Sequence, residues 1–372
     1  MAIDHLQGAK AQLAAQIESG SVVAGRPIPA DPWVVSSLLQ KSIRRGETEI
    51  AQRAAFTLYG QRGSAIWRRL LVVAFEDVGI GDVNAVLATV AVASDSAWRK
   101  SHGGDLPLAI HIAGILAASP KDRSADHLAG AKDHPEFADF ARAMSTTTMD
   151  ARLALVGDRA APLPKRAIAA VLSSGMASEA KGQTSTGDGE ALLAAFREMG
   201  VPAELVTAAS IAAAKTREPI TLMVPLIWLA AKGLRTASVQ DCGVPSLVYA
   251  NDLPLYALDE HTRLGREAIW RFARQSAPVS ACLERFVPED QRRRAANVAA
   301  FYADAAPVAR RLVWDQSDDL EAFGTERDLL VAGVPRQGIT PLLEAVRTNL
   351  GHLNDARAAV LTKSRLRTGH HP

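Results

Sequence analysis

The chain has 372 residues, of which 48% are hydrophobic, 22% charged and 5% aromatic, the profile of a globular protein long enough for two domains. Its formal net charge of +2 excludes a wholly basic, histone-like nucleic-acid binder. Two cysteines are too few for a disulfide scaffold, and the apolar run Ile220–Ala231 is too short to cross a bilayer. Since the first residues also lack a secretory pattern, we expect a cytoplasmic protein without membrane contact.

Helix signals are dense in the first third of the chain. Polar or proline residues open each apolar stripe, and glycine closes most of them. The expected helices run from Asp31 to Gly46, Glu47 to Gly60, Ser64 to Gly79, Asp82 to Ala97 and Asp105 to Ala118. Short connections between such helices predict antiparallel neighbours in an α bundle.

The second half shows the same periodicity. Its expected helices are 190–200, 203–216, 220–232, 259–275, 289–314, 318–331 and 341–363, with a kink or break at Pro307. Residues 238–248 are the only strand candidate, and Gly243 and Pro245 favour an irregular connection there. We therefore predict an all-α fold. Its expected parts are an extension (1–30), a collar-like helical domain (31–177), a linker (178–189) and a C-terminal helical domain (190–372).

Sequence motifs for catalysis are missing. No GxxxxGK[ST] loop is present, and the glycine-rich stretch 182–189 has no following lysine, so a P-loop ATPase is not expected. The histidines His102, His111, His127 and His134 form no HxxxH or HExxH pair, and no GxSxG elbow occurs. We predict no catalytic residue, no metal site and no cofactor.

One polar cluster keeps an enzyme hypothesis open. Asp259, Glu260 and His261 precede a predicted helix, where acidic residues commonly act as caps. Together with Arg263 they form the alternative prediction, an active site of unrecognised type in the C-terminal half. Capping is the simpler interpretation.

Arginines gather at several places, as expected for phosphate contacts. The predicted nucleic-acid-binding set is Arg44, Arg45, Arg68, Arg69, Arg263, Arg266, Arg274, Arg292, Arg293 and Arg294. Arg263, Arg266 and Arg274 share one face of a predicted helix. Arg44 and Arg45 close a helix, where a cation also complements the helix dipole. A solvated charged surface is the competing explanation for each cluster.

Three short motifs follow one another between Leu38 and Asp82. They are Lys41-Ser42-Ile43-Arg44, Ile66-Trp67-Arg68-Arg69-Leu70, and Phe75-Glu76-Asp77-Val78-Gly79 followed by Asp82. In order and spacing, residues 33 to about 120 resemble the C-terminal region of the replication-associated recombination protein A family. These proteins are bacterial relatives of the Werner-helicase-interacting protein, in the clamp-loader branch of AAA+ ATPases.

The resemblance implies a helical collar that drives oligomerisation, usually to tetramers, in proteins acting at stalled forks and DNA ends. The ATPase portion of the family is missing here, Ala74-Phe75 replaces a small polar residue, and nothing beyond Asp150 matches. We therefore expect a non-catalytic helical protein of DNA replication, recombination or repair that assembles with itself and contacts DNA or protein partners.

The same motif residues also have a structural interpretation. Lys41, Ser42, Glu76, Asp77, Gly79 and Asp82 are predicted to be fold determinants. The two carboxylates end an apolar helix and need partners if buried, and the nearby Arg68 and Arg69 need partners for the same reason. The expectation is an ion-pair network that fixes the turn after the third helix.

Overall fold

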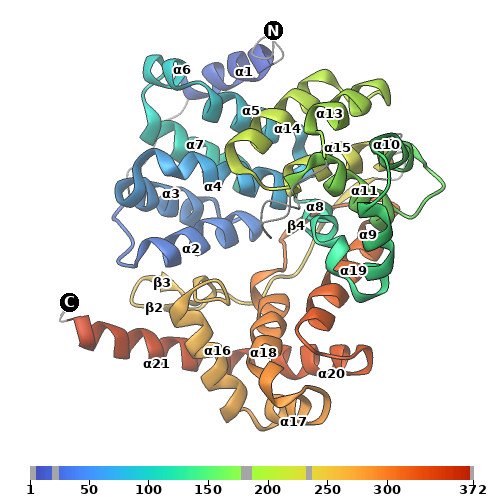
Figure 1. Ribbon diagram of the computed structural model, residues 1–372. Coiled ribbons are helices and arrows are strands. Elements are labelled where there is room, and N and C mark those ends of the chain that lie inside the picture. The colour runs from blue at the N-terminus through green and yellow to red at the C-terminus, as the bar shows by residue number, and fades with distance from the viewer. Residues whose placement is uncertain (1–5, 19–24, 177–186, 232–236, 369–372) are drawn as a thin grey trace.

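A computed structural model describes residues 6–18, 25–176, 187–231 and 237–368 (Figure 1). The described chain is predominantly helical with four short strands, so the all-α prediction is confirmed. Across these described ranges, every helix is too short or too polar to span a membrane.

The N-terminal helices pack as the short connections predict (Figure 1). They are α1 (Gln7–Glu18), α2 (Pro32–Arg44), α3 (Thr48–Arg62), α4 (Ile66–Val73), α5 (Val83–Ser94), α6 (Ser96–Ser101) and α7 (Asp105–Ala118). Asp31 caps α2 by accepting hydrogen bonds from the backbone N–H groups of Trp33 and Val34 at 2.9 and 3.1 Å. Asp82 caps α5 through the N–H of Ala85 at 3.0 Å. Both starts lie where the sequence places them.

A second group of helices completes the same hydrophobic core. It consists of α8 (Ser124–Ala129), α9 (Ala138–Ser145), α10 (Met149–Gly157), α11 (Leu163–Ser174), α13 (Gly189–Glu198), α14 (Ala203–Thr216) and α15 (Ile220–Ala231). Most of the predicted linker lies outside the described residues. Because α14 and α15 pack against α4, α5 and α11, the core does not divide at 178–189 as expected.

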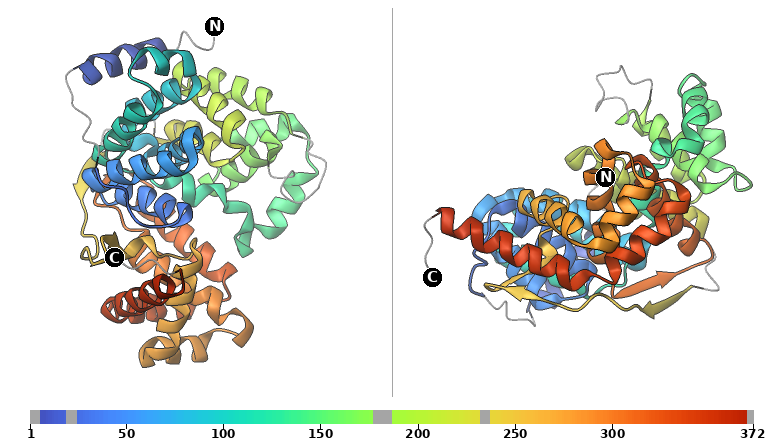
Figure 2. Two further views of the ribbon diagram at one scale, coloured as in Figure 1. Left: turned by 90° about the vertical axis from the view of Figure 1, so that its left-hand side faces the viewer. Right: turned by 90° about the horizontal axis from the view of Figure 1, so that it is seen from below.

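The strands form two small antiparallel pairs. β1 (Ser238–Asp241) pairs with β4 (Arg310–Val313), and β2 (Tyr249–Ala250) pairs with β3 (Leu253–Pro254). The β1–β4 ribbon lies along one side of the molecule (Figure 2). An irregular connection over 238–248 was therefore the wrong prediction for its first four residues, whose partner lies about 70 residues away in the sequence.

The C-terminal helices enclose a second core, at the bottom of Figure 1. They are α16 (Arg263–Gln275), α17 (Ala277–Phe286), α18 (Arg292–Ala300), α19 (Ser317–Val331), α20 (Arg336–Arg347) and α21 (Leu350–Thr368). The break expected at Pro307 within the helix 289–314 is confirmed, because α18 ends as the π-helix Phe301–Ala305 just before that proline. The helix expected after Pro307 is wrong, since residues 310–313 form β4. The helix expected over 341–363 is divided between α20 and α21.

The first core contains residues up to Ala268 together with Trp314, Leu320, Val360 and Leu361, and the second contains residues between Ile269 and Ala356. The layer between them contains a large share of the buried charged side chains.

Candidate functional site

A network of charged side chains lies between the two cores, and we call it the charged junction. Its members are Lys41, Arg44, Glu76, Asp77, Arg123, Asp259, Asp304 and Arg357. Most of these side chains are nearly or completely buried. Buried charges are tolerated only when they are paired and hydrogen-bonded, so the geometry of each pair decides whether the junction holds.

Asp77 lies at the centre of the charged junction, on the π-helix Ala74–Val78. Its carboxylate accepts from Arg44 Nε at 2.5 Å and Gln40 Nε2 at 2.9 Å, and Arg123 Nε lies 3.2 Å away. Burial alone raises a carboxyl pKa, but the charges of Arg44 and Arg123 outweigh burial and lower the pKa of Asp77. The lowered pKa favours the carboxylate anion, which is held by two guanidinium groups.

The same two arginines reach the C-terminal core. Arg44 donates to the carbonyl of Ala305 and Arg123 to the carbonyl of Ala306, both at 3.3 Å. Their guanidinium carbons lie 5.4 and 5.7 Å from the ring centroid of Phe301, within the range of a cation–π contact. Two π-helices thus meet across a pair of arginines, and π-helices are frequent at functional sites.

Two further ion pairs complete the charged junction. Lys41 on α2 pairs with Asp259 in the loop before α16, and both side chains are 1% exposed. Arg357 on α21 pairs with Asp304 at 2.5 Å and donates to the carbonyl of Leu258 at 3.0 Å. Burial is the largest influence on Lys41 and lowers its pKa, although Asp259 opposes the shift.

The motif residues from the resemblance are brought together at this junction or beside it. Glu76 pairs with Arg44 at 2.7 Å. Gly79 has a φ of +51°, and a Cβ there would lie 2.7 Å from the carbonyl oxygen of Asp122, so the turn requires glycine. Asp82 also accepts from Ser119 Oγ at 2.8 Å, and Ser42 Oγ donates within its own helix to the carbonyl of Leu39. The expected ion-pair network is present.

The partners in that network differ from the expected ones. Arg68 is exposed and donates to the carbonyl of Thr216 at 2.7 Å, and Arg69 donates to the side-chain oxygen of Gln40. Neither forms an ion pair with Glu76 or Asp77 in the described part of the chain.

Two predicted nucleic-acid contacts are wrong. Arg44 is 1% exposed and Arg45 is 5% exposed, so neither guanidinium can reach a phosphate. Arg44 is held by Glu76 and Asp77, as described above. Arg45 pairs with Glu47 at 2.9 Å and lies 4.6 Å from the ring centroid of Tyr256.

The predicted nucleic-acid-binding arginines on α16 and α18 lie closer to the surface than Arg44 and Arg45 do. Arg263, Arg266 and Arg274 are exposed on α16, and Arg293 and Arg294 are exposed on α18, with Arg292 half-buried beside them. Within the described residues, none of these six forms an ion pair. Arg266 donates to the carbonyl of Glu260 at 2.8 Å, and Arg292 donates to that of Val287 at 3.1 Å.

The residues of the enzyme hypothesis lie at the N-terminal end of α16. Asp259 is neutralised by Lys41 and accepts from the backbone N–H of His261 at 3.1 Å. Thr262 caps α16 by accepting from the N–H of Gly265 at 3.0 Å. His261 and Arg263 are exposed. The capping interpretation describes this arrangement, and its cap residue is Thr262.

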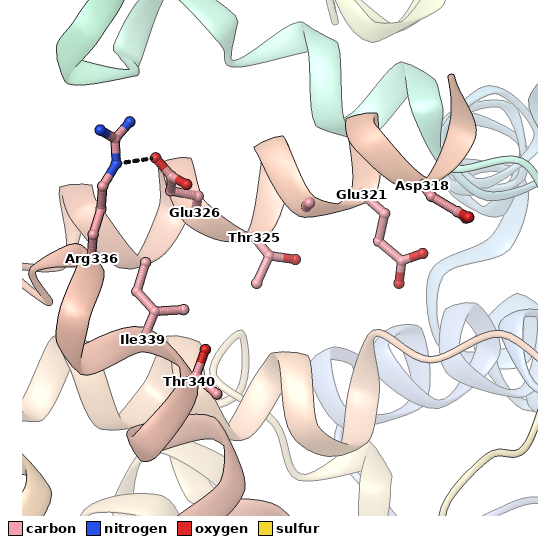
Figure 3. A pocket seen from close by; sticks show the side chains of 8 residues that line it. Asp318, Glu321, Thr325, Glu326, Arg336, Ile339 and Thr340 are labelled. Carbon is pink, nitrogen blue, oxygen red and sulfur yellow. Dashed lines mark hydrogen bonds and ion pairs between the residues drawn. The ribbon is translucent and has the colours of Figure 1, made fainter. Parts of the chain in front are cut away.

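A separate groove lies between α19 and α20 (Figure 3). It encloses about 520 Å³, with Asp318 and Glu321 at one end and the Arg336–Glu326 pair, 2.7 Å apart, at the other. Asp318 and Glu321 both pair with Arg311 at 2.8 Å. Among the described residues, no three His, Cys, Asp or Glu side chains are grouped closely enough to hold a metal ion.

Glu260, the neighbour of Asp259 in the sequence, makes the stability of the fold depend on pH. Burial, together with the carboxylates of Asp259 and Asp328, raises the pKa of Glu260 from 4.5 to about 7. The folded state therefore binds a proton more tightly than the unfolded state does. The stabilisation that protonated Glu260 gives the folded state is fully present below pH 4.5. It is lost as the pH rises through about 7.

Replacing Glu260 by glutamine is expected to remove this dependence. In urea titrations at several pH values, the wild type should lose stability relative to the Glu260→Gln variant as the pH rises from about 5 to about 7. The same slope in both proteins would show that Glu260 does not titrate in this range.

Sequence reasoning missed Arg123, Asp304 and Arg357 as members of the junction. Arg123 has a local signal, since Lys121, Asp122 and Arg123 are three consecutive charged residues between two apolar helices. Asp304 and Arg357 lie in ordinary helical patterns, and nothing nearby in the sequence marks them.

Comparison of the chain with protein-family models, with curated proteins and with solved structures finds no match.

Proposed function

We propose that this protein is a non-catalytic helical scaffold of DNA replication, recombination or repair, which assembles with itself and contacts DNA through arginines of α16 and α18. The single observation that carries the DNA contact is the set of exposed arginines on these helices that form no ion pair within the described residues. The family resemblance of residues 33 to about 120 is a second, weaker support.

Charge distribution strengthens the proposal. Residues 263–294 contain eight arginines and four acidic residues, a net charge of +4, whereas the whole chain carries only +2. Elsewhere arginines such as Arg44, Arg99 and Arg336 are bound to carboxylates. Exposed guanidinium groups without an ion pair attract phosphates and release counterions, and they need no base-reading element.

The charged junction has a supporting role in this proposal. The pair of Lys41 with Asp259 ties the loop before α16 to α2. The two arginines at Asp77 bind the end of the π-helix that follows α18. The arginine-bearing helices are therefore held rigidly on the N-terminal bundle. The enzyme hypothesis gains no comparable support, because Asp259 is already neutralised by Lys41.

The proposal predicts a loss of DNA binding when the charge of α16 is reversed. A triple variant, Arg263→Glu, Arg266→Glu and Arg274→Glu, should weaken binding at low salt by about 100-fold or more, and lower the salt slope by about one unit per lost contact. Fluorescence anisotropy with forked, single-stranded and duplex oligonucleotides over a salt series measures both effects.

A second triple variant provides the matched control. Arg142→Glu, Arg159→Glu and Arg197→Glu change three exposed arginines outside α16–α18 and give the same net charge. This control should bind DNA almost as the wild type does. Equal losses in the two triple variants would mean that only overall charge matters, and absence of any binding at low salt would refute the DNA contact.

A further inference from the structure

The outer edge of the β1–β4 ribbon is open. β4 is bonded on both sides, because Lys121 donates its backbone N–H to the carbonyl of Arg310 and accepts from the N–H of Leu312, both at 2.9 Å, while β1 covers the other side. Within the described chain, β4 is the one strand that pairs with β1. All four residues of β1 are exposed, and the ribbon lies along one side of the molecule (Figure 2). β1 is therefore an edge strand, held in place by β4.

The register of the ribbon shows which backbone groups of β1 point outward. The N–H of Cys242 donates to the carbonyl of Ala309 at 2.7 Å, and successive residues of an antiparallel strand face its partner and the opposite side in turn. The backbone groups of Ser238 and Gln240 therefore face β4, and those of Val239 and Asp241 face away from it. Among the described residues, these outward N–H and C=O groups have no hydrogen-bond partner, so they can bind a further strand.

The edge lacks the features that commonly protect a free strand from pairing. β1 contains no lysine and no proline. The carboxylate of Asp241 lies 3.6 Å from Arg310 Nε, so its charge is partnered within the ribbon. Val239 is 46% exposed, and every exposed large apolar side chain of the described chain except Trp33 lies in the segment 239–249. This segment is therefore suited to contact with another chain.

A second copy of this chain fits the edge. When two β1 strands pair antiparallel around a two-fold axis with Val239 facing its counterpart, the outward N–H and C=O groups form reciprocal hydrogen bonds. Val239 lies opposite Leu312 within the ribbon, so this pairing makes one row of four apolar side chains across a four-stranded sheet. Ser238 then faces Gln240 of the second copy, which sets a hydroxyl against an amide.

Charge favours the same register. With Val239 on the axis, the two Asp241 side chains lie at opposite ends of the pairing, about 14 Å apart along the strands. A shift that brings Asp241 onto the axis would set two carboxylates directly against each other, which is destabilising. The edge is thus complementary to itself in hydrogen bonding, apolar contact and charge.

We propose that β1 is the self-association surface of this protein and that it pairs with β1 of a second copy around a two-fold axis. The inference rests on the self-assembly in the proposed function and names the surface that performs it. One short strand buries less area than a stable dimer needs. Leu247, Val248 and Tyr249 follow β1 closely in the sequence, are exposed, and supply further apolar area.

A charge swap at residue 239 tests the pairing in the full chain. Light scattering after size-exclusion chromatography measures the molar mass. Val239→Lys should halve the mass relative to the wild type, because two like charges then face each other on the axis, and Val239→Glu should do the same. An equal mixture of the two variants should regain the wild-type mass, since opposite charges then meet. Trp33→Lys is the matched control, because it introduces the same charge at another exposed apolar side chain and should leave the mass unchanged.

The outcomes separate this inference from the proposed function. If the wild type is oligomeric and Val239→Lys keeps its mass, or the mixture stays at half of it, the β1 pairing is overturned and self-assembly stands. A wild type with the mass of one chain at every concentration overturns both. The DNA contact is judged independently by fluorescence anisotropy, in which Val239→Lys should still bind oligonucleotides because the arginines of α16 and α18 are unchanged.

Discussion

Replacing Asp77 by alanine is expected to destabilise the fold by about 3–5 kcal/mol, the cost of leaving buried charges without their partner. Asp77 is 0% exposed and is held by Arg44 Nε at 2.5 Å and Arg123 Nε at 3.2 Å. Without its carboxylate, both guanidinium groups stay buried with less compensation. Urea unfolding followed by circular dichroism measures the change, and Asp77→Asn provides a variant of the same shape without the charge.

The control is an exposed ion pair. Asp139 is 91% exposed and pairs with Arg142 at 2.8 Å, so Asp139→Ala should change the free energy of unfolding by about 1 kcal/mol or less. A loss in Asp77→Ala no larger than in Asp139→Ala would contradict the role given to the charged junction.

The helix starts of the N-terminal bundle could be predicted because their signals are local. Asp31 and Asp82 cap the helices that directly follow them, and both effects depend on residues two or three positions away. The all-α class follows for the same reason, since apolar spacing within each segment identifies a helix without reference to the rest of the chain.

The errors lie where distant segments decide the conformation. Ser238–Asp241 becomes a strand because Arg310–Val313 pairs with it, and that partner is invisible in its own pattern. The π-helix Phe301–Ala305 accepts hydrogen bonds at its end from Arg44 and Arg123, which come from the other core. A helical pattern in the sequence cannot show where such contacts end a regular α-helix.

The burial of Arg44 and Arg45 has the same cause. Both stand at a helix end, where a sequence pattern is equally compatible with a solvent-facing cation. Their partners include Asp77, 33 positions later, and the ring of Tyr256, more than 200 positions later. Arg263, Arg266 and Arg274 remain exposed because no carboxylate from another element reaches them within the described residues. The buried and the exposed arginines carry the same charge. The side chains that reach them from other elements decide which of them are buried.

Replacing Gly265 by alanine is expected to give the second large loss of stability. Gly265 lies in the first turn of α16, and a Cβ there would lie 2.0 Å from the carbonyl oxygen of Asp259 and 2.5 Å from its backbone nitrogen. These backbone atoms cannot rotate aside as a side chain can. The loop must therefore move, which disturbs the pair of Asp259 with Lys41 and the bond from Arg357 to the carbonyl of Leu258. Overpacking alone costs about 1–3 kcal/mol, and the disturbed ion pair adds to it.

Gly60→Ala tests whether the loss comes from this close approach rather than from the loss of glycine. Gly60 lies inside α3, and nothing is within 4 Å of the position its Cβ would take, so alanine there should stabilise the protein by about 0.5–1 kcal/mol. Urea unfolding compares the two variants, and amide hydrogen exchange of residues 258–265 reports on the loop itself. Gly265→Ala should unfold at lower urea and exchange faster in that loop. If it is as stable as Gly60→Ala, with unchanged exchange, then α16 is not pressed against the loop, and the rigid attachment of the arginine surface to the N-terminal bundle is wrong.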